Sequence, residues 1–301
     1  MTPLSGRLLG LVAGFAADRR WGDPARWHPV AGFGRAAAAL ERVTYADRRL
    51  PGVVHVTLLV GAATALGTRR PGVIGTAVAT WAVLGGRSLD REAAAVQRLL
   101  EEGDLPGARR RLTHLVGRDT SRLDEAAIAR AVIESVAENT SDAVVAPLVW
   151  GALLGPPGLL AYRAANTLDA MVGHRSPRYE RFGWAAARLD DVLNLPASRL
   201  TAALAVLLGE DRSAARAAWR RDAPGHPSPN AGPVEAAFAG ALGVRLGGVN
   251  VYAGRVEDRQ VLGDGRAPDA HDITRARRLA SRVGVGALVA IAPIALRPRR
   301  R

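Results

Sequence analysis

Apolar and charged residues are segregated along this chain, and the apolar stretches determine its predicted architecture. Two windows without a charged residue, Leu50–Thr68 and Ala143–Tyr162, approach the ~20 mostly apolar residues with which a helix crosses a bilayer. Three shorter apolar stretches cover residues 71–86, 192–209 and 283–296, and Arg199 in the second of these must extend to the membrane interface or face protein. The pattern predicts a polytopic integral membrane protein.

The polar segments between these stretches are also predicted to be helical. Apolar residues recur at helical spacing over Arg91–Glu102 and again over Leu123–Glu138. A loop rich in proline and glycine, Pro224–Pro233, precedes a stretch of small residues, strand signals are weak, and no internal repeat is seen. We therefore expect an all-α fold in one membrane domain, residues 1–301, with helical segments outside the bilayer. A soluble protein with buried core helices is the alternative that composition leaves open.

Charge and composition narrow the class of protein. The chain has 41 Lys+Arg against 28 Asp+Glu, and because no lysine is present all 41 are arginines, whose guanidinium suits bidentate binding of phosphate and carboxylate. A GC-rich genome would also produce this composition. The arginines are dispersed and aromatic residues amount to only 5%, so nucleic-acid binding is not expected. The absence of cysteine excludes disulfides, thiolate zinc sites and cysteine nucleophiles.

Two clusters of polar residues lie in the first half of the chain. Asp23 and His28 each precede a proline, which disfavours helical backbone and predicts an extended loop, although Asp23 could instead cap the following segment. Glu134 and Glu138 are four residues apart, so on a helix their carboxylates share a face and repel each other. A divalent cation such as Mg²⁺ would relieve that repulsion. A solvated acidic face near Arg130 is the alternative.

A third cluster follows the apolar window that ends at Tyr162. Asn166 and Asp169 are three residues apart and share a helix face. Gly173 can end that helix and leave His174 and Arg175 at its rim, where a histidine beside an acid and an arginine suggests a functional site. Asp190, Asp191 and Asn194 are expected to close the same loop. A histidine that merely lies at the surface is the alternative for His174.

The fourth cluster is the proline-spaced segment Gly225–Glu235, which contains His226, Ser228 and Asn230. Rigid loops of this kind present backbone N–H groups and small hydroxyls to anionic ligands. Asn230 could also cap the helix that we expect to begin near Pro233, which would bring a helix N-terminus to the ligand. A plain linker is the alternative.

Together these clusters resemble the signature of the CobD/CbiB family, the adenosylcobinamide-phosphate synthases. The resemblance covers essentially the whole chain, and the second and third motifs together are specific. The motifs are Asp18 with Gly22-Asp23-Pro24 and His28-Pro29-Val30, Glu134-Ser-Val-Ala-Glu138-Asn139-Thr-Ser-Asp142, Asn166-Thr-Leu-Asp169-Ala-Met-Val-Gly173-His174, and Gly225-His226-Pro-Ser-Pro-Asn230-Ala-Gly232.

The resemblance implies a membrane ligase late in the biosynthesis of cobalamin (vitamin B12). Such an enzyme would use ATP and Mg²⁺ to join (R)-1-amino-2-propanol, or its O-phosphate, to the carboxylate of the corrinoid adenosylcobyric acid. The product would be adenosylcobinamide or its phosphate. Besides these substrates, the expected partners are membrane lipid and later membrane enzymes of the pathway.

The family's chemistry suggests roles for the residues of the four clusters. ATP would first phosphorylate the carboxylate, and the amine would then attack the acyl phosphate. We expect Mg²⁺–ATP to be held by Glu134, Glu138 and Asp142. We expect the carboxylate to be oriented, or the amine deprotonated, by Asn166, Asp169 and His174, with Glu134 and Glu138 also in the catalytic set. Phosphate and substrate would be bound by Asp23, His28, Arg163, Arg175, His226, Ser228 and Asn230.

The location of the chemistry follows from the membrane prediction. The arginine-rich segment 297–301 should be cytosolic by the positive-inside rule, and we expect the four clusters to converge on one cavity at the cytosolic side of the cytoplasmic membrane. A non-catalytic signalling protein similar to AmpE, a distant relative of the family, is the main alternative. A transporter is a third possibility, but it should carry ionisable residues in mid-span, and the two charge-free windows have none.

Overall fold

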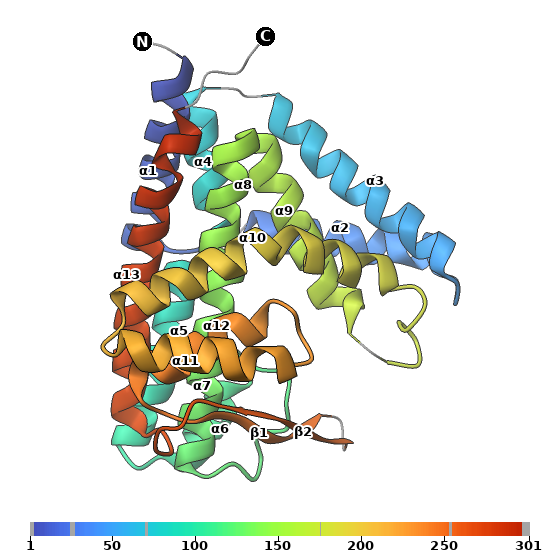
Figure 1. Cartoon of the computed structure of the whole chain (residues 1–301). Coiled ribbons are helices and arrows are strands. Elements are labelled where there is room, and N and C mark those ends of the chain that lie inside the picture. Colours follow the sequence, from blue (N-terminus) through green and yellow to red (C-terminus); the bar gives the residue numbers. More distant parts are fainter. Residues whose placement is uncertain (1–2, 25–27, 70–71, 175, 253–254, 297–301) are drawn as a thin grey trace. The chain divides into compact units, whose positions relative to one another are not determined.

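The computed structural model describes residues 3–24, 28–69, 72–174, 176–252 and 255–296, and most of them are helical (Figure 1). The chain divides into two compact units, which are described separately below. Unit 1 comprises the described residues of Met1–Gly85, Asp142–Pro196 and Leu288–Arg301, and unit 2 those of Gly86–Ser141 and Ala197–Ala287. The assignment of the whole chain to one domain stays a prediction.

Unit 1 is built from closely packed helices. Helices α1 and α4 approach closely because α1 places Gly10 and Gly14 against Thr76 and Thr80 of α4, and a Cβ at either glycine would collide with the facing threonine. A second contact joins α3 to α9, where Gly67 lies against the backbone of Pro157. The elements that lie within unit 1 are α1 (Pro3–Trp21), α2 (Pro29–Thr44), α3 (Arg49–Thr68), α4 (Val73–Val83), α8 (Ala146–Leu154), α9 (Pro156–Leu168) and the π-helix η2 (Asp169–Gly173).

Unit 2 combines helices with one β-hairpin. Helix α12 is its core element, since every one of its residues is buried, and it packs against α7 and α11. The elements that lie within unit 2 are α5 (Gly86–Glu101), α6 (Leu105–Leu112), α7 (Glu125–Thr140), α11 (Arg212–Asp222), the 3-10 helix η3 (Ala223–Gly225), α12 (Ala231–Leu242), β1 (Leu246–Tyr252) and β2 (Arg255–Leu262). Three further elements have residues in both units: the π-helix η1 (Ser141–Val145), α10 (Trp184–Leu208) and α13 (Ala270–Ala295).

Within the described residues, three helices are long and apolar enough to cross a membrane, namely α3, α10 and α13. They contain the predicted stretches 50–68, 192–209 (except its last residue) and 283–296 (except its last residue). The stretch 71–86 forms α4, which has only 11 residues and cannot cross a bilayer as one helix. The multi-pass prediction is thus supported for three of the five stretches.

The prediction of a continuous span over Ala143–Tyr162 is wrong. The chain ends α8 at Leu154, turns at Gly155 and returns as α9, so that the two short helices pack against each other. Gly155 has φ +74°, a left-handed conformation that glycine adopts without strain, and two prolines follow it at the start of α9. This apolar stretch is therefore a helical hairpin of unit 1, and most residues of α8 are buried in it.

The prediction of an all-α fold also needs one correction, because β1 and β2 form an antiparallel hairpin (Figure 1). Gly248 pairs with Arg259 and Leu246 with Leu262, and the register shifts between these pairs at Gly247. A bulge of this kind redirects the backbone. Here the N–H of Gly247 points toward α7, where it donates to the carboxylate of Glu134.

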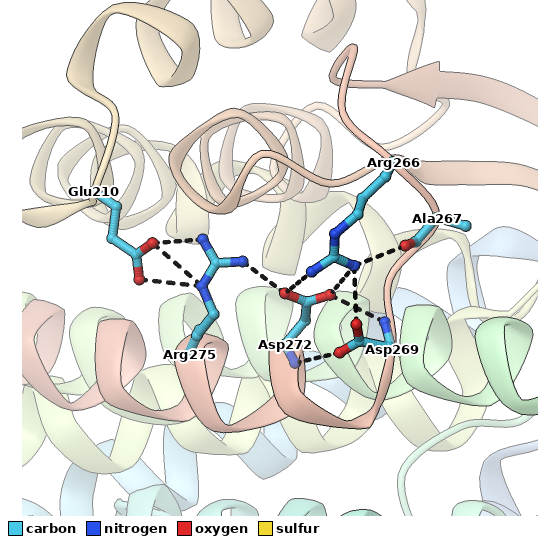
Figure 2. Close-up of polar contacts among 6 residues, drawn as sticks. All are labelled: Glu210, Arg266, Ala267, Asp269, Asp272 and Arg275. Atoms are coloured by element: carbon cyan, nitrogen blue, oxygen red, sulfur yellow. Dashed lines mark hydrogen bonds and ion pairs between the residues drawn. The ribbon is translucent and has the colours of Figure 1, made fainter.

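A network of arginines and acids anchors the start of α13, as Figure 2 shows. The carboxylate of Asp272 has no exposed surface and accepts hydrogen bonds from Arg266 at 2.7 Å and from Arg275 at 2.6 Å. Its Oδ2 atom also accepts from the backbone N–H of Asp269 at 3.0 Å. Arg275 continues the chain of contacts to Glu210. Asp272 thus ties the first turn of α13 to the segments before it.

We expect Asp272→Ala to lower the free energy of unfolding by about 2–4 kcal/mol, since hydrogen bonds to a charged group each contribute about 1.5–3 kcal/mol and the two arginines would lose theirs together. Thermal or denaturant unfolding in detergent measures the change. Asp264→Ala is the matched control, because Asp264 is exposed and pairs with Arg221 at the surface. Equal stability of the two variants would contradict the anchoring role.

The three candidate spans also predict behaviour in cell fractionation. Exposed apolar side chains lie along α3, including Leu50, Leu58 and Leu66, which a soluble helix would have to leave in water. We expect the protein to sediment with membranes and to be released by detergent but not by high salt or alkaline carbonate. Recovery in the soluble fraction without detergent would show that these helices do not enter a bilayer.

Candidate functional site

Helix α7 carries the two glutamates of the second motif. Asp124 begins the helix by accepting a hydrogen bond from the N–H of Ala127 at 2.8 Å, and Glu125 in the first turn complements the helix dipole. The α-helix ends at Thr140 and continues as the π-helix η1, a local form that is frequent at functional sites. The four-residue spacing of Glu134 and Glu138 therefore falls on regular helix, as predicted.

Glu134 is buried and fully engaged by the protein. One carboxylate oxygen, Oε2, accepts from Arg118, and both side chains of this pair are about 5% exposed. The other oxygen, Oε1, accepts from the backbone N–H of Gly247 at 2.8 Å. Arg118 thus neutralises the charge of Glu134, and Arg118 and the N–H of Gly247 together hold its carboxylate in place. Neither partner was identified from the sequence.

Two further glutamates lie close to this pair. Glu138 of α7 remains solvent-accessible although protein surrounds its carboxylate, whereas Glu235 of α12 is only 4% exposed. Desolvation raises the pKa of both groups, and mutual repulsion with Glu134 raises it further. Arg259 and Arg118 act in the opposite direction. We call Glu134, Glu138, Glu235, Arg118, Arg259 and His226 the α7–α12 cluster.

The proline-spaced loop supplies His226 to this cluster. Nδ1 of His226 lies 3.1 Å from the backbone N of Ser228 and 3.3 Å from its carbonyl oxygen, and on the shorter contact we assign Nδ1 as the acceptor and the ring proton to Nε2. Nε2 lies 3.9 Å from Oε2 of Glu235. Nε2 is buried and has no hydrogen-bond partner among the described residues. Burial lowers the pKa of His226, which is therefore neutral near pH 7.

Ser228 and Asn230 have structural contacts in this loop. The hydroxyl of Ser228 accepts from the N–H of Ala231 at 3.1 Å and so caps α12, a role that we had predicted for Asn230. The side-chain oxygen of Asn230 instead accepts from the hydroxyl of Ser198 and from Arg199, each at 2.9 Å. Binding of phosphate by this loop stays a prediction.

Unit 1 contains a second polar group, which we call the α9 cluster: Asp142, Tyr162, Arg163, Asn166, Asp190 and Asn194. Arg163 donates to Oδ1 of Asn166 at 3.2 Å, and Asn166 donates to Asp190 at 3.3 Å. Asn194 donates to Asp142. Asp190 and Asn194 belong to helix α10, which corrects the prediction that they close a loop.

Tyr162 of the α9 cluster is deeply buried, and the neighbouring Arg163 is half-buried. The hydroxyl of Tyr162 is buried and has no hydrogen-bond partner among the described residues. Arg163 lies close enough to Asp23, Asp142 and Asp190 to interact with all three carboxylates. One guanidinium therefore connects residues of the first, second and third motifs within unit 1.

The first motif is held by His28. Its Nδ1 accepts from the N–H of Val30 at 3.1 Å and caps α2, while its Nε2 lies 3.3 Å from Oδ1 of Asp23. The helix cap is thus His28 and not Asp23, which had been the alternative for that residue. Asp23 is held next to Arg163 by this pair.

Residues of the third motif that follow α9 lie in different surroundings. Asp169 begins the π-helix η2, and its carboxylate lies over Gly173, where a Cβ would collide with it. His174 is exposed and stacks edge-on against Tyr179, with 5.1 Å between the ring centroids. The structure thus places His174 at the surface, and its predicted catalytic role stays untested. Arg175 lies outside the described residues.

The structure therefore brings Glu134 and Glu138 of the second motif together with the fourth motif in unit 2, and Asp142 of the second motif together with the first and third motifs in unit 1. Glu235 could have been identified from the sequence, because it is the lone charge in the otherwise uncharged stretch 231–242. Tyr162 and Arg118 gave no signal, since neither stands at a spacing that indicates a partner. The chemical roles of all these residues stay predictions.

Comparison with known proteins identifies the family. A model of the CobD/CbiB proteins matches residues 11–280. The chain is 53% identical to the cobalamin biosynthesis protein CobD of Mycobacterium tuberculosis, with 97% of each chain covered. It is 49% identical to the protein of the same name from Chromobacterium violaceum, over 88% of this chain and 89% of that one, and 47% identical to that of Stutzerimonas stutzeri, over 93% and 96%.

No solved structure matches the chain. The family match covers both clusters, from Asp23 in the first motif to Arg259 in the β-hairpin. The extent of the family match and the identity to these relatives together establish that the chain belongs to the CobD/CbiB family.

Proposed function

We propose that this protein acts in cobalamin biosynthesis as an adenosylcobinamide-phosphate synthase, which joins an amino alcohol to a corrinoid carboxylate. The observation that carries the proposal is the α7–α12 cluster, which holds buried acids, arginines and a histidine whose Nε2 has no hydrogen-bond partner among the described residues. It lies within a chain that matches relatives named for cobalamin biosynthesis over almost its whole length. Perturbed titratable groups gather at functional sites more often than elsewhere.

The reaction that we propose forms an amide at the expense of ATP. A carboxylate oxygen of the corrinoid attacks the γ-phosphorus of ATP, ADP leaves, and an acyl phosphate results. The nitrogen of the neutral amine then forms a bond to the acyl carbon and loses one proton to water, and inorganic phosphate leaves with the C–O electron pair. The protein contributes mainly by positioning the reactants and neutralising charge. Arg163, supported by Asn166, is suited to bind the transferred phosphate.

Mg²⁺ is the metal that such a use of ATP implies. Glu134 does not fit as a ligand, because both of its oxygens already accept hydrogen bonds from Arg118 and Gly247. Across the described part of the chain, no three His, Asp or Glu side chains are grouped so as to hold a metal ion. We therefore derive no step through a metal. Mg²⁺–ATP remains part of the proposal as the cosubstrate, whose phosphates commonly supply many of the oxygen ligands.

We place the enzyme in the cytoplasmic membrane with its active site on the cytosolic side. The three candidate spans support an integral membrane protein. The side is proposed because ATP is available in the cytosol. The alternative of an AmpE-like signalling protein is not favoured, since the relatives matched over nearly full length carry names from cobalamin biosynthesis.

An assay of the full-length protein in detergent tests the function. Purified protein is incubated with adenosylcobyric acid, ATP, Mg²⁺ and either (R)-1-amino-2-propanol or its O-phosphate, and product mass and ADP are measured. We expect ADP release to require the corrinoid carboxylate and the product to have the mass of the amide. ADP release that is independent of the corrinoid, with no amide formed from either amine, would contradict the proposal.

A further inference from the structure

The α7–α12 cluster contains two carboxylates that the protein does not neutralise directly. Glu134 is satisfied by Arg118 and the N–H of Gly247. Glu138 and Glu235, by contrast, accept no hydrogen bond from any described residue, although α7 and α12 pack against each other and bring the two acids within electrostatic range. Glu235 is only 4% exposed, and a carboxylate with so little access to water is costly to ionise without a partner, whereas Glu138 is solvent-accessible.

The basic groups near these two acids are either bound to other residues or neutral. The guanidinium of Arg118 is paired with Glu134, and that of Arg259 binds Glu257 at 3.1 Å. His226 is the other basic group at the cluster, and it is neutral near pH 7. The pKa values of Glu138 and Glu235 are raised, so their surroundings disfavour the charged forms although Arg118 and Arg259 act in the opposite direction. A bound cation would stabilise the ionised carboxylates.

His226 independently indicates a ligand at the same place. Its side chain is only 2% exposed, and its Nε2 points toward Glu235 at 3.9 Å, too far for a hydrogen bond. With Nδ1 accepting from the N–H of Ser228, the shorter of its two contacts with that residue, Nε2–H is a donor that has no acceptor among the described residues. Glu235 thus connects the two other groups, since it lies 3.9 Å from Nε2 of His226 and within electrostatic range of Glu138.

We propose that Glu138, Glu235 and His226 form the pocket that binds the protonated amine of the amino-alcohol substrate. An ammonium group donates three hydrogen bonds and carries one positive charge, which suits two carboxylates. The oxygen on the neighbouring carbon of an amino alcohol, free or phosphorylated, is the acceptor that Nε2–H of His226 lacks. A bare metal ion would leave that donor unused. The absence of a three-ligand group among the described residues also argues for an organic cation.

This inference rests on the proposed function, because the substrate is taken from it. It goes further by assigning the amine to unit 2 and to Glu235, which the sequence motifs did not single out. It also gives the raised pKa values of Glu138 and Glu235 a physical role, since an arriving ammonium stabilises the ionised form of both acids.

Glu235→Gln tests the pocket in the full-length protein in detergent. The substitution keeps the shape of the side chain and removes its charge. We expect the KM for (R)-1-amino-2-propanol, or for its O-phosphate if that is the amine used, to rise about tenfold or more, as loss of a charge-assisted hydrogen bond would require. The KM values for ATP and for the corrinoid should change less than about twofold, within the spread of uncoupled sites.

The controls separate an amine pocket from other roles. Glu125→Gln is the same substitution on an exposed residue of α7 and should leave every KM unchanged. His226→Asn is a second variant in the pocket, and it should raise the KM of the same amine. If Glu235→Gln instead raises the KM for ATP or the requirement for Mg²⁺, the cluster binds the nucleotide or its metal and the inference is wrong. An unchanged KM for the amine would also overturn it.

Direct binding keeps the inference testable if the proposed reaction fails. Isothermal titration with (R)-1-amino-2-propanol, its O-phosphate and 1,2-propanediol, which lacks the amine, measures affinity without turnover. We expect the wild type to bind an amine and not the diol, and Glu235→Gln to lose that binding while its melting temperature stays close to that of the wild type. Wild-type binding without amide formation would refute the reaction alone. No binding of either amine, or equal binding by Glu235→Gln, would refute the pocket.

Discussion

Glu138→Gln should abolish turnover while the protein remains folded and inserted in the membrane. The carboxylate of Glu138 is accessible, is crowded by protein and has no hydrogen-bond donor among the described residues, so its charge serves something other than packing. The isosteric amide removes that charge. We expect kcat/KM to fall about 100-fold or more, the effect of removing a group positioned for the chemistry. Steady-state assays with each substrate varied in turn measure the loss.

The interpretation of that loss depends on which constants change. Failure to bind the amine would be consistent with an ammonium pocket, and a changed response to Mg²⁺ would favour the metal-ligand role predicted from the sequence. Near-normal activity with an unchanged Mg²⁺ requirement would mean that Glu138 belongs to a solvated helix face. Size-exclusion profile and melting temperature establish whether the variant is folded.

Arg118→Met should produce the largest loss of stability. Arg118 and Glu134 form an ion pair in which both side chains are almost fully buried, so the substitution leaves the carboxylate of Glu134 without its cation. Removing one partner of a buried pair typically costs about 3–5 kcal/mol, because the remaining charge is neither solvated nor paired. Unfolding in detergent should show a correspondingly lower midpoint.

A double variant distinguishes the lost pair from lost packing. Arg118→Met combined with Glu134→Gln removes both charges, and the amide oxygen can still accept from the N–H of Gly247. We expect the double variant to recover most of the stability. Arg111→Met is the control, since Arg111 and its partner Glu92 are partly exposed and should contribute less than about 1 kcal/mol. If the double variant is as unstable as Arg118→Met, packing and not charge explains the loss.

The hydrophobic pattern was sufficient to predict some of the helices but not the positions at which the chain turns. The stretch Leu50–Thr68 coincides with α3 to within one residue, because a long uncharged stretch with no break has few alternatives. Ala143–Tyr162 is equally apolar, yet it forms two helices. An apolar run looks the same whether lipid or protein surrounds it, and only the sequence Gly155-Pro156-Pro157 marks the turn.

The β-hairpin shows a different limit of the sequence. Strand β1 begins with two glycines after Leu246, and β2 contains four charged residues, so neither has the alternation that predicts a half-buried strand. Their pairing comes from tertiary contacts with α7, α11 and α12. The hairpin was therefore missed, and with it the N–H of Gly247.

Local spacing predicted which acids share a face, but not what they contact. Glu134 and Glu138 are one helical turn apart on α7, as expected. The partners of Glu134 come from residues 16 and 113 positions away, which no local pattern indicates. Likewise, Asn166 contacts Asp190, 24 residues further along the chain. Side-chain partners that depend on the packing of distant segments could not be derived from a single sequence.

The π-helix η2 has a consequence for the angular position of everything that follows it. Its wider turn accommodates one residue more than an α-helical turn would, and each residue of a helix rotates the chain by about 100°. Deleting Ala170 would let α9 continue as regular helix, but it would turn the segment from Gly173 onward by that angle. Gly183, which fits only because it lacks a Cβ against the carbonyl of Val172, would then lose its docking position. The extra residue thus determines the direction in which the chain leaves the end of α9. A relative with one residue fewer at this point would need a compensating insertion before Gly183.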